Sequence, residues 1–438
     1  MAEWAGLARG FVLAAPHSGS GKTLVTLGLL RALTRRGVAV APAKTGPDYI
    51  DPAFLSRAAG TPTVNLDPFA MTPPRLKALA GSAARDAKLL VVEGVMGLFD
   101  GAAGGGGSTA DLAAALGLPV VLVIDCARMA QSVAAIAQGF AGLRADVQMA
   151  GVILNKVASD RHEAMLRGAL HQIAMPVIGV VRRDDGLTVP DRHLGLILPG
   201  EVEGIEAIIE AAADAVEGGL DFDRLEALAA PVPDGQAKSL PPLGQRIAIA
   251  RDACFAFTYE HWLRDWRARG AEMSFFSPLA DEAPAANADA IYLPGGYPEL
   301  HGQALEAATG FRQGLMAARD RGALIYGECG GYMVLGRAII DRAGNRFGMT
   351  GLLPHETAID APRRILGYRR ITHRGPLHWG EALMGHEFHY SRESSPGAET
   401  ALFTATDATG NDARSHGGVD GRVCGSYLHV IDAAREGL

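Results

Sequence analysis

Six short apolar runs recur along the first half of the chain, and a segment of helical periodicity follows each of them. The runs are GFVLAA, GVAVAPAK, AKLLVVEG, LPVVLVID, MAGVILNK and MPVIGVV. Runs this apolar are typical of parallel strands buried on both faces, and helical segments such as Lys22 to Arg36 suit the crossovers between them. The pattern predicts a doubly wound α/β domain with a parallel sheet over residues 1–216.

The alternation of strands and helices stops near residue 217 and starts again near residue 246. Residues 217–245 concentrate glycine, proline and polar side chains, so we expect a linker there. The runs RIAIARD, AEMSFFSP, DAIYLPGG and GALIYGECGG then follow. They predict a second α/β domain over residues 246–438, and 438 residues indeed exceed what one hydrophobic core usually organises.

Charge and cysteine usage narrow the class of partner. The chain has 41 Lys and Arg against 48 Asp and Glu, a net charge of −7, which argues against a nucleic-acid or membrane surface built on positive charge. The four cysteines (Cys126, Cys254, Cys329 and Cys424) are far apart and form no C-x-x-C pair, as expected in a reducing cytoplasm. No apolar run approaches the ~20 residues of a membrane span. Small-molecule partners are expected, and a homo-oligomer stays open.

The stretch APHSGSGKT at residues 15–23 lies between an apolar strand and a helix, which is the context of a phosphate-binding P-loop. Backbone N–H groups of such a loop bind phosphate, Lys22 would reach the terminal phosphates, and the Thr23 hydroxyl can bind Mg²⁺. Pro16 replaces the first glycine of the motif and removes one N–H donor. A purely structural turn is the alternative. The expected ATP-binding residues here are Ser18, Gly19, Ser20, Gly21, Lys22 and Thr23.

Acidic residues and a lysine follow two further strands. KTGPDYID at residues 44–51 ends one strand, and Glu93 ends another, at the edge where α/β sheets place their ligands. Mg²⁺ prefers oxygen ligands and phosphates, so Thr23, Asp48 and Glu93 are the predicted metal site. Lys44 would help to balance phosphate charge. The alternative for each acid is a helix cap or a solvated loop residue.

A cysteine between glycines marks the second half. GECGG places Cys329 after an apolar strand and before a helix, the shape of a nucleophile elbow, where the helix N-terminus favours a thiolate. A structural thiol is the alternative. The loop PGGYPE follows another strand, and we expect Gly295, Gly296 and Tyr297 to bind the oxyanion of a thiol-bound intermediate. His429, after the last apparent strand, is the expected base.

The motifs APHSGSGKT, KTGPDYIDP, EGVMGLFDG, GSTADLA and GVILNKV together resemble the cobyrinic acid a,c-diamide synthase family, which acts in corrin biosynthesis. PGGYPE, GECGGY and GSYLH resemble class I glutamine amidotransferases, so the resemblance covers nearly the whole chain. It implies a dethiobiotin-synthetase-like ATP domain with Mg²⁺. It also implies that Asn155 contacts adenine, unless it is a strand-end turn residue, and that Asp51 and Asp100 lie near the substrate carboxylate or metal.

The amidotransferase resemblance leaves the third catalytic residue open. Many members carry Glu two residues after the histidine, where this chain has Ile431. The site would then work as a Cys-His pair, or a carboxylate from elsewhere such as Glu387 would complete it. His386 and His389 are weaker candidates for catalysis or substrate contact. For an anionic corrin, contacts from arginines are expected, with Arg128, Arg161 and Arg192 as examples.

The two halves together suit one reaction. ATP converts an unreactive carboxylate into an acyl phosphate, and glutamine supplies unprotonated ammonia beside it. The resemblance implies amidation of the a and c acetates of a corrin polycarboxylate with L-glutamine, with the ring metal left open. Other acids remain alternatives: different corrin carboxylates, a nickel tetrapyrrole or a cell-wall precursor. So does a non-enzymatic P-loop ATPase switch with a degenerate second half.

Overall fold

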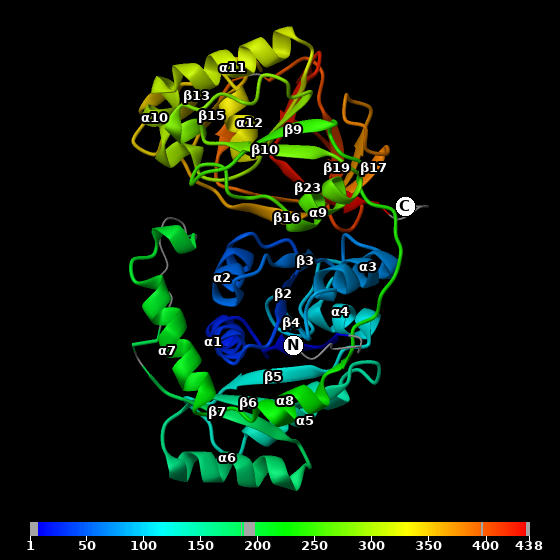
Figure 1. The fold of residues 1–438 in the computed structure, drawn as a ribbon, viewed down its shortest axis with the longest axis vertical. Helices are drawn as coiled ribbons and strands as arrows, with labels where there is room; N and C mark the ends of the chain where they lie inside the picture. The colour runs from blue at the N-terminus through cyan, green and yellow to red at the C-terminus, as the bar shows by residue number, and fades with distance from the viewer. Residues whose placement is uncertain (1–7, 185, 188–197, 396, 435–438) are drawn as a thin grey trace. The chain divides into compact units, whose positions relative to one another are not determined.

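The computed structural model describes residues 8–184, 186–187, 198–395 and 397–434. Two compact units divide the chain (Figure 1), the first formed by residues 1–101 and 105–238 and the second by residues 102–104 and 239–438. Each unit has its own hydrophobic core. The two-domain α/β architecture predicted from the sequence is confirmed.

A parallel sheet with the strand order β3-β2-β4-β1-β5-β6-β7 organises the first unit. All six apolar runs form strands in it, and the structure adds β3, a three-residue edge strand too short to be predicted. The strands are β1 (Arg9–Ala14), β2 (Val40–Thr45), β3 (Val64–Leu66), β4 (Leu89–Glu93), β5 (Val120–Asp125), β6 (Met149–Val157) and β7 (Val177–Arg182). The helices are α1 (Lys22–Arg35), α2 (Ile50–Ala59), α3 (Pro73–Ala84), α4 (Thr109–Leu116), α5 (Val133–Gly142), α6 (Asp160–Gln172), α7 (Ile205–Glu217) and α8 (Phe222–Leu228), with a 3₁₀ turn at Pro199–Glu201.

Both faces of this sheet are covered, which explains why its strands lack a polar face. Phe11 and Val91 belong to the cluster that also contains residues of α1, α2 and α7. Their neighbours Val12 and Val92, which point to the opposite face, are fully buried as well. Continuous apolar runs are therefore the expected sequence signature.

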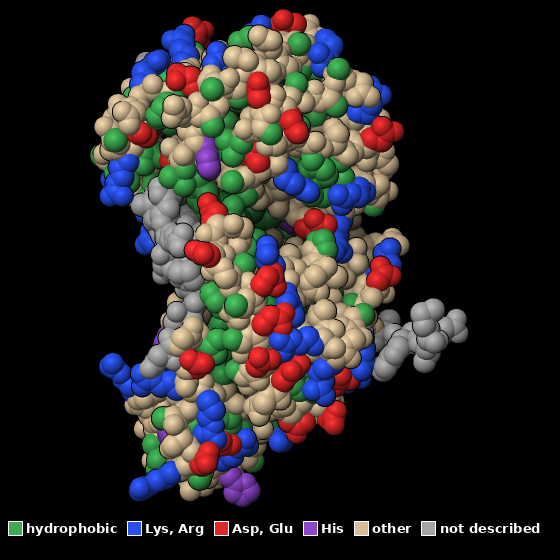
Figure 2. Space-filling model, turned by 60° about the vertical axis from the view of Figure 1, so that its left-hand side comes forward, with side chains coloured by type: hydrophobic (Ala, Val, Ile, Leu, Met, Phe, Trp, Pro, Cys, Tyr) green, Lys and Arg blue, Asp and Glu red, His purple; other side chains and the backbone are tan. Residues whose placement is uncertain are grey.

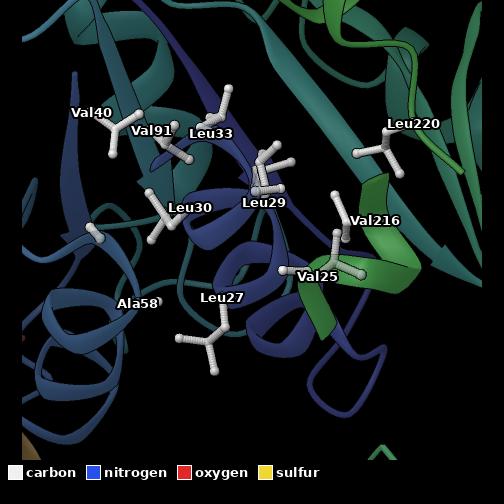
Figure 3. Close-up of a cluster of buried hydrophobic side chains, with 14 of the residues drawn as sticks. Val25, Leu27, Leu29, Leu30, Leu33, Val40, Ala58, Val91, Val216 and Leu220 are labelled. Atoms are coloured by element: carbon white, nitrogen blue, oxygen red, sulfur yellow. The ribbon is translucent and has the colours of Figure 1, made fainter. Parts of the chain in front are cut away.

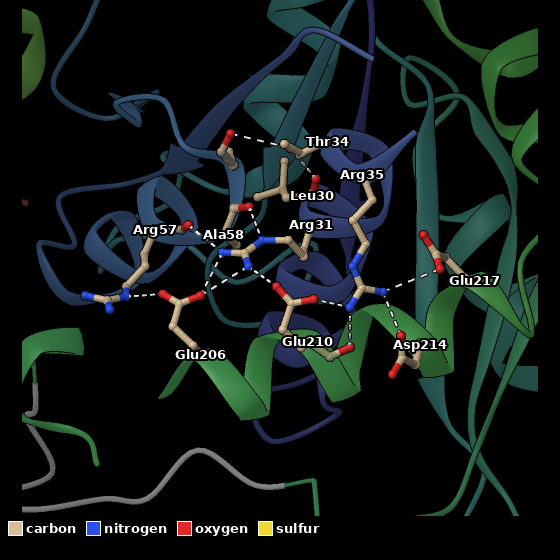
Figure 4. Close-up of polar contacts among 11 residues, drawn as sticks. Leu30, Arg31, Thr34, Arg35, Arg57, Ala58, Glu206, Glu210, Asp214 and Glu217 are labelled. Carbon is tan, nitrogen blue, oxygen red and sulfur yellow. Dashed lines mark hydrogen bonds and ion pairs between the residues drawn. The ribbon is translucent and has the colours of Figure 1, made fainter. Parts of the chain in front are cut away.

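Helix α7 packs along α1, the helix that follows the phosphate-binding loop. Leu29 and Val25 of α1 lie in one apolar cluster with Val216 (Figure 3). The approach is closest at Gly28, where an added Cβ would lie 2.7 Å from the carbonyl carbon of Ala212. Ion pairs border this contact (Figure 4), joining Arg31, Arg35 and Arg57 to Glu206, Glu210, Asp214 and Glu217. These ion pairs link α7 to α1 and, through Arg57, to α2.

The predicted linker at residues 217–245 contains regular structure. Helix α8 lies inside it, capped by Asp221 and buried through Phe222 and Leu225. Strand β8 (Ala230–Pro231) then pairs antiparallel with β1, and the first unit extends to Lys238. The sequence reading did not predict α8 because its apolar pattern is short and lies among glycines and prolines.

A six-stranded sheet with the order β10-β9-β11-β12-β22-β21 organises the second unit, and only β21 runs antiparallel to its neighbour in it. Its strands are β9 (Arg246–Ala250), β10 (Glu272–Phe276), β11 (Ala290–Leu293), β12 (Leu324–Glu328), β21 (Gly418–Asp420) and β22 (Val423–Ser426). The helices are α9 (Glu260–Ala268), α10 (Gly302–Ala307), α11 (Thr309–Asp320) and α12 (Gly330–Leu335), with 3₁₀ turns at Pro278–Ala280 and Pro298–Leu300.

Two smaller sheets lie between α12 and the end of the described chain, and the sequence reading did not anticipate them. One has the order β14-β13-β15-β18, and the other, β20-β19-β16-β17-β23, is antiparallel throughout. Their bounds are β13 (Ala338–Ile340), β14 (Arg346–Gly348), β15 (Glu356–Ala358), β16 (Ile365–His373), β17 (Ala382–His389), β18 (Arg392–Glu393), β19 (Phe403–Thr406), β20 (Arg414–His416) and β23 (Leu428–Ala433). Because β22 and β23 are separated by one residue, the chain passes directly from the central sheet into the antiparallel one.

A membrane span needs a long apolar helix, and a basic binding surface needs a concentration of Lys and Arg side chains. Among the helices that the structure describes, none has the length and apolar character needed to span a bilayer. On the face drawn in Figure 2, Lys and Arg side chains alternate with Asp and Glu side chains, and no broad basic area stands out.

Candidate functional site

Residues 15–21 form a tight loop between β1 and α1. Gly19 and Gly21 have φ angles of 83° and 81°, a left-handed conformation that side chains disfavour. Helix α1 begins at Lys22, so the loop N–H groups and the helix N-terminus lie together, as anion binding requires. The loop approaches Gly97 closely at Pro16. A Cβ added to Gly97 would lie 2.6 Å from the Pro16 carbonyl oxygen.

Asn155, predicted to contact adenine, lies under this loop. Its Nδ2 donates to the carbonyl oxygen of Ser20 at 2.9 Å, and its Oδ1 accepts from the Lys156 N–H at 2.9 Å. The side chain is 4% exposed. These contacts show that Asn155 holds the loop in place, and adenine recognition stays a prediction.

Glu93, fully buried at the end of β4, is the centre of a cluster of polar side chains. Its Oε1 accepts hydrogen bonds from Thr23 Oγ1 at 3.1 Å, Lys44 Nζ at 2.6 Å and Lys22 Nζ at 3.5 Å. Its Oε2 is buried and has no hydrogen-bond partner among the described residues. A buried carboxylate oxygen without a donor is costly unless something else binds it.

The two lysines of the cluster have opposite electrostatic environments. Burial opposes the charge of Lys44, but Asp51 and Glu93 outweigh it and raise the pKa of this ammonium group. Lys44 also forms an ion pair with Asp51. For Lys22 burial dominates and lowers the pKa, although Glu93 acts in the other direction. The same carboxylate, Glu93, thus acts on both lysines, but only for Lys44 do the acidic neighbours outweigh burial.

The remaining predicted acids differ in position. Asp48 caps α2, accepting from the Ile50 N–H at 2.8 Å, and its other oxygen lies 4.0 Å from Lys44 Nζ. These contacts at the start of α2 resemble a helix cap, and a metal-binding role for Asp48 stays a prediction. Asp100 is exposed and accepts from the Gly97 N–H at 2.9 Å, and it does not line the pocket of this unit.

The loop and the cluster open into a pocket of about 1080 Å³. Its walls include all of the predicted ATP residues together with Asp48 and Asp51. The sequence reading missed Lys156, Arg182 and Arg183, which also line it. Their place at the ends of β6 and β7 was the available signal. Of the expected arginines, Arg128 lines the pocket, Arg161 does not, and Arg192 is outside the described residues.

Cys329 occupies a strained turn between β12 and α12. Its φ of 47° and ψ of −105° are unusual for a residue with a side chain. The thiol is buried at 6% exposure, with Sγ 3.8 Å from the Phe388 carbonyl oxygen. Burial raises the pKa of the thiol, and the Gly330 N–H opposes this only in part. Burial thus favours the neutral thiol at this turn.

The predicted glycine loop lies beside the cysteine. A Cβ on Gly295 would come within 2.7 Å of His429 Cε1 and 3.4 Å of Cys329 Cβ, so the two side chains flank this glycine. The Gly296 N–H lies 3.0 Å from where a Cβ on Gly330 would be. Tyr297 is buried against Phe257 with ring centroids 5.1 Å apart. The loop and the cysteine thus form one site.

His429 lies inside β23, whereas the sequence reading placed it after the last strand. It pairs across the sheet with His386, and the two rings stack with centroids 4.8 Å apart. Burial lowers the pKa of His429 well below its usual value, and the neighbouring His386 and His389 add to this. The neutral form of the imidazole is therefore favoured.

The structure does not bring Glu387 to His429. Glu387 forms an ion pair with Arg369 at 2.6 Å and contacts His389 Nε2 at 2.9 Å. As the neighbour of His386 on β17, it points to the opposite face of that strand. The carboxylate that does face His429 is Glu328, whose Oε2 lies 3.9 Å from Nδ1. The sequence reading quoted this residue within GECGG without giving it a role.

Comparisons with known proteins agree with both halves. Residues 11–197 match the CobQ/CobB/MinD/ParA nucleotide binding domain, and residues 246–437 match the CobB/CobQ-like glutamine amidotransferase domain. The hydrogenobyrinate a,c-diamide synthases of a Sinorhizobium species and of Rhizobium meliloti are each 55% identical, covering 97% of this chain and 99% of theirs. That of Brucella abortus is 53% identical over 98% of this chain.

A nucleotide-binding P-loop domain joined to a glutamine amidotransferase domain defines the class of ATP-dependent, glutamine-using amide ligases. Full-length identity of this degree then shows the family. The chain belongs to the family of the hydrogenobyrinate a,c-diamide synthases and acts in cobalamin biosynthesis.

Proposed function

We propose that this enzyme amidates the a and c acetate carboxylates of hydrogenobyrinic acid, using ATP and L-glutamine. The observation that carries the proposal is the 55% identity to hydrogenobyrinate a,c-diamide synthases over nearly the whole of both chains. The names of these relatives favour the metal-free ring over cobyrinic acid. The products are ADP, phosphate, glutamate and the diamide.

The first unit activates the carboxylate. An oxygen of the substrate carboxylate attacks the γ-phosphorus of ATP, the bond to the bridging oxygen breaks, and ADP leaves. Lys22 and the loop N–H groups would hold the phosphates, and Lys44 would neutralise charge that develops during the transfer. Asp51, which fixes Lys44, acts through that lysine. Lys156 and Arg182 at the ends of β6 and β7 form ion pairs with acidic side chains, and would contact the polyanionic ring from the pocket wall.

The residues of this site fit Mg²⁺. Glu93 Oε2 is a buried oxygen with no donor, and Thr23 Oγ1 lies beside the other oxygen of the same carboxylate. Oxygen ligands with phosphate company are what this ion takes, so Glu93 and Thr23 would hold it. When bound, it neutralises phosphate charge and orients the transfer. Asp48 serves less directly because its Oδ1 caps α2.

The second unit releases ammonia. Cys329 attacks the amide carbon of glutamine, the carbon–nitrogen bond breaks, and water later hydrolyses the thioester to glutamate. Backbone donors of Gly295 and Gly296 would stabilise the oxyanion. The released ammonia attacks the acyl phosphate and expels phosphate. Four buried free cysteines are consistent with a cytoplasmic setting.

The first test supplies purified protein with ATP, Mg²⁺, glutamine and either hydrogenobyrinic or cobyrinic acid. Product mass should report two replacements of carboxyl OH by NH₂ on the metal-free ring, with two glutamates released per ring. A Cys329→Ala variant should lose the reaction with glutamine and keep it with concentrated ammonia. No mass change on either ring would refute the substrate, and glutamine use by the variant would refute the nucleophile.

A further inference from the structure

Glu328, the residue just before the nucleophile, is a fully buried carboxylate at the end of β12. Its Oε1 accepts from the Tyr326 hydroxyl at 2.7 Å and from the Val430 N–H at 3.1 Å. Its Oε2 accepts from the Tyr292 hydroxyl at 2.8 Å. Three donors from three strands hold one carboxylate, although a buried glutamine or an apolar side chain would fill the same space at lower cost.

The held carboxylate faces the catalytic histidine. Glu328 Oε2 lies 3.9 Å from His429 Nδ1, and both side chains are at most 2% exposed. Cε1 of the same ring is beside Gly295 and therefore toward Cys329. With Nδ1 toward Glu328, Nε2 is on the far side of the ring from the carboxylate. This arrangement has the polarity of a nucleophile, base and orienting acid.

We propose that Glu328 is the acid that positions His429 and stabilises its imidazolium form while Cys329 attacks glutamine. The proposal rests on the proposed glutamine-using function. The thiol proton moves to His429 Nε2, and its electron pair forms the bond from sulfur to the amide carbon. The same proton then leaves with the ammonia as the carbon–nitrogen bond breaks. Nδ1–H donates to Glu328 once the imidazolium forms, and Glu328 exchanges no proton in this cycle.

The gap of 3.9 Å suits a base that is neutral before substrate binds. Catalytic hydrogen bonds are often long in the absence of substrate and shorten once charge develops. A positive charge on His429 would be costly beside His386, which stacks on it, and His389, which also lowers its pKa. The carboxylate opposite Nδ1 offsets that cost. Glu328 thus takes the place of the glutamate that many amidotransferases carry two residues after the histidine, where this chain has Ile431.

The charge state of Glu328 gives the role a measurable signature. Burial raises the pKa of Glu328 to about 7, although hydrogen bonds from Tyr326, Tyr292 and Val430 oppose the shift. His429 is the basic side chain that the structure places against it. Below this pKa the neutral acid stabilises an imidazolium poorly. Glutamine hydrolysis should therefore rise with pH through about 7 as Glu328 ionises.

The test measures glutamate release by the full-length wild type and by Glu328→Gln, which keeps the size of the side chain and one acceptor oxygen but cannot ionise. We expect the glutamine-dependent kcat to fall on the order of 10–1,000-fold and the rising limb near pH 7 to disappear. KM for glutamine and the ammonia-dependent amidation should change little. Glu328→Asp, which keeps the charge, should recover part of the rate and the pH limb.

A variant that disturbs only the surroundings of Glu328 separates a structural role from a positioning one. Tyr292→Phe removes one donor to the carboxylate but leaves the acid, so it should lower the melting temperature while keeping the pH limb. Glu328→Gln with wild-type kcat and pH profile would overturn the proposal. So would loss of both the ammonia and glutamine reactions in Glu328→Gln and Glu328→Asp alike. No glutamate release by the wild type would instead overturn the proposed function itself.

Discussion

Lys44 and Glu93 are direct neighbours in the parallel sheet, and Lys44 Nζ lies 2.6 Å from Glu93 Oε1. The pair joins the ends of β2 and β4, where Thr23 of the phosphate-binding helix also contacts Glu93. Strand ends on adjacent parallel strands meet at one edge of the sheet. The pairing thus links charge at the base of the nucleotide site to a carboxylate whose other oxygen has no hydrogen-bond partner among the described residues.

Glu93→Gln should abolish most ATP-dependent amidation with either glutamine or ammonia. The variant removes the charge of the proposed metal ligand, and a loss on the order of 100-fold or more is expected from one missing electrostatic group. Glutamate release measured without ATP should persist, because it belongs to the other unit. Glu226→Gln, which removes a half-exposed ion pair with Lys88, is the matched control and should keep full activity. Equal activity of both variants would refute the role of Glu93.

Gly295→Ala should stop the use of glutamine while sparing the ammonia reaction. The new Cβ would come within 2.7 Å of His429 Cε1, and displacing a catalytic group by about 1 Å can cost ~100-fold in rate. Gly380→Ala in the same unit is the control, because an added Cβ meets nothing within 4 Å there. Steady-state rates with each nitrogen donor make the comparison. An unchanged glutamine rate in Gly295→Ala would contradict the described geometry.

Gly28→Ala and Gly168→Ala should change stability in opposite directions. At Gly28 the added methyl group would press α7 away from α1, with Val216 Cγ2 at 2.9 Å, and overpacking typically costs about 1–3 kcal/mol. Gly168 is exposed within α6 and has open space around it. Alanine there should add about 0.5–1 kcal/mol by restricting the unfolded chain. Thermal unfolding of the three proteins checks both signs.

Acid should weaken the second unit through the buried His355. Its ring stacks on Tyr332 at 3.9 Å, and burial lowers the pKa of His355 to about 4. Because the unfolded chain binds a proton below pH 6.5 and the folded chain does not, stability is full above pH 6.5 and falls below it. Between pH 6.5 and 5 this loss is about 2 kcal/mol.

His355→Gln removes that titration and should make stability less dependent on pH. Unfolding temperatures of the wild type and the variant at pH 7 and pH 5 test this, since all other histidines are common to both. A wild-type drop equal to that of the variant would contradict a neutral His355 in the folded protein.

The amino-acid sequence was enough to predict the central strands of both sheets, the phosphate-binding loop and the elbow at Cys329. Each of these is written locally, as an apolar run or as glycines around one reactive residue. The helix α8 in the expected linker and the edge strand β3 were missed because their apolar patterns are too short to stand out. The antiparallel sheet that contains β23 depends on pairings between distant segments, which local patterns do not encode.

The sequence by itself determined which reactive groups the chain carries: a nucleotide-binding loop, a cysteine on a strand-to-helix turn, and the kinds of acidic and basic residues that accompany them. Only the tertiary structure decided which of them meet. It placed Glu328 opposite His429, turned Glu387 toward Arg369, left Asp100 outside the pocket and set Asn155 under the loop. The physical reason is that strand pairing and side-chain alternation fix which face each residue points to, and those pairings join residues far apart in the chain.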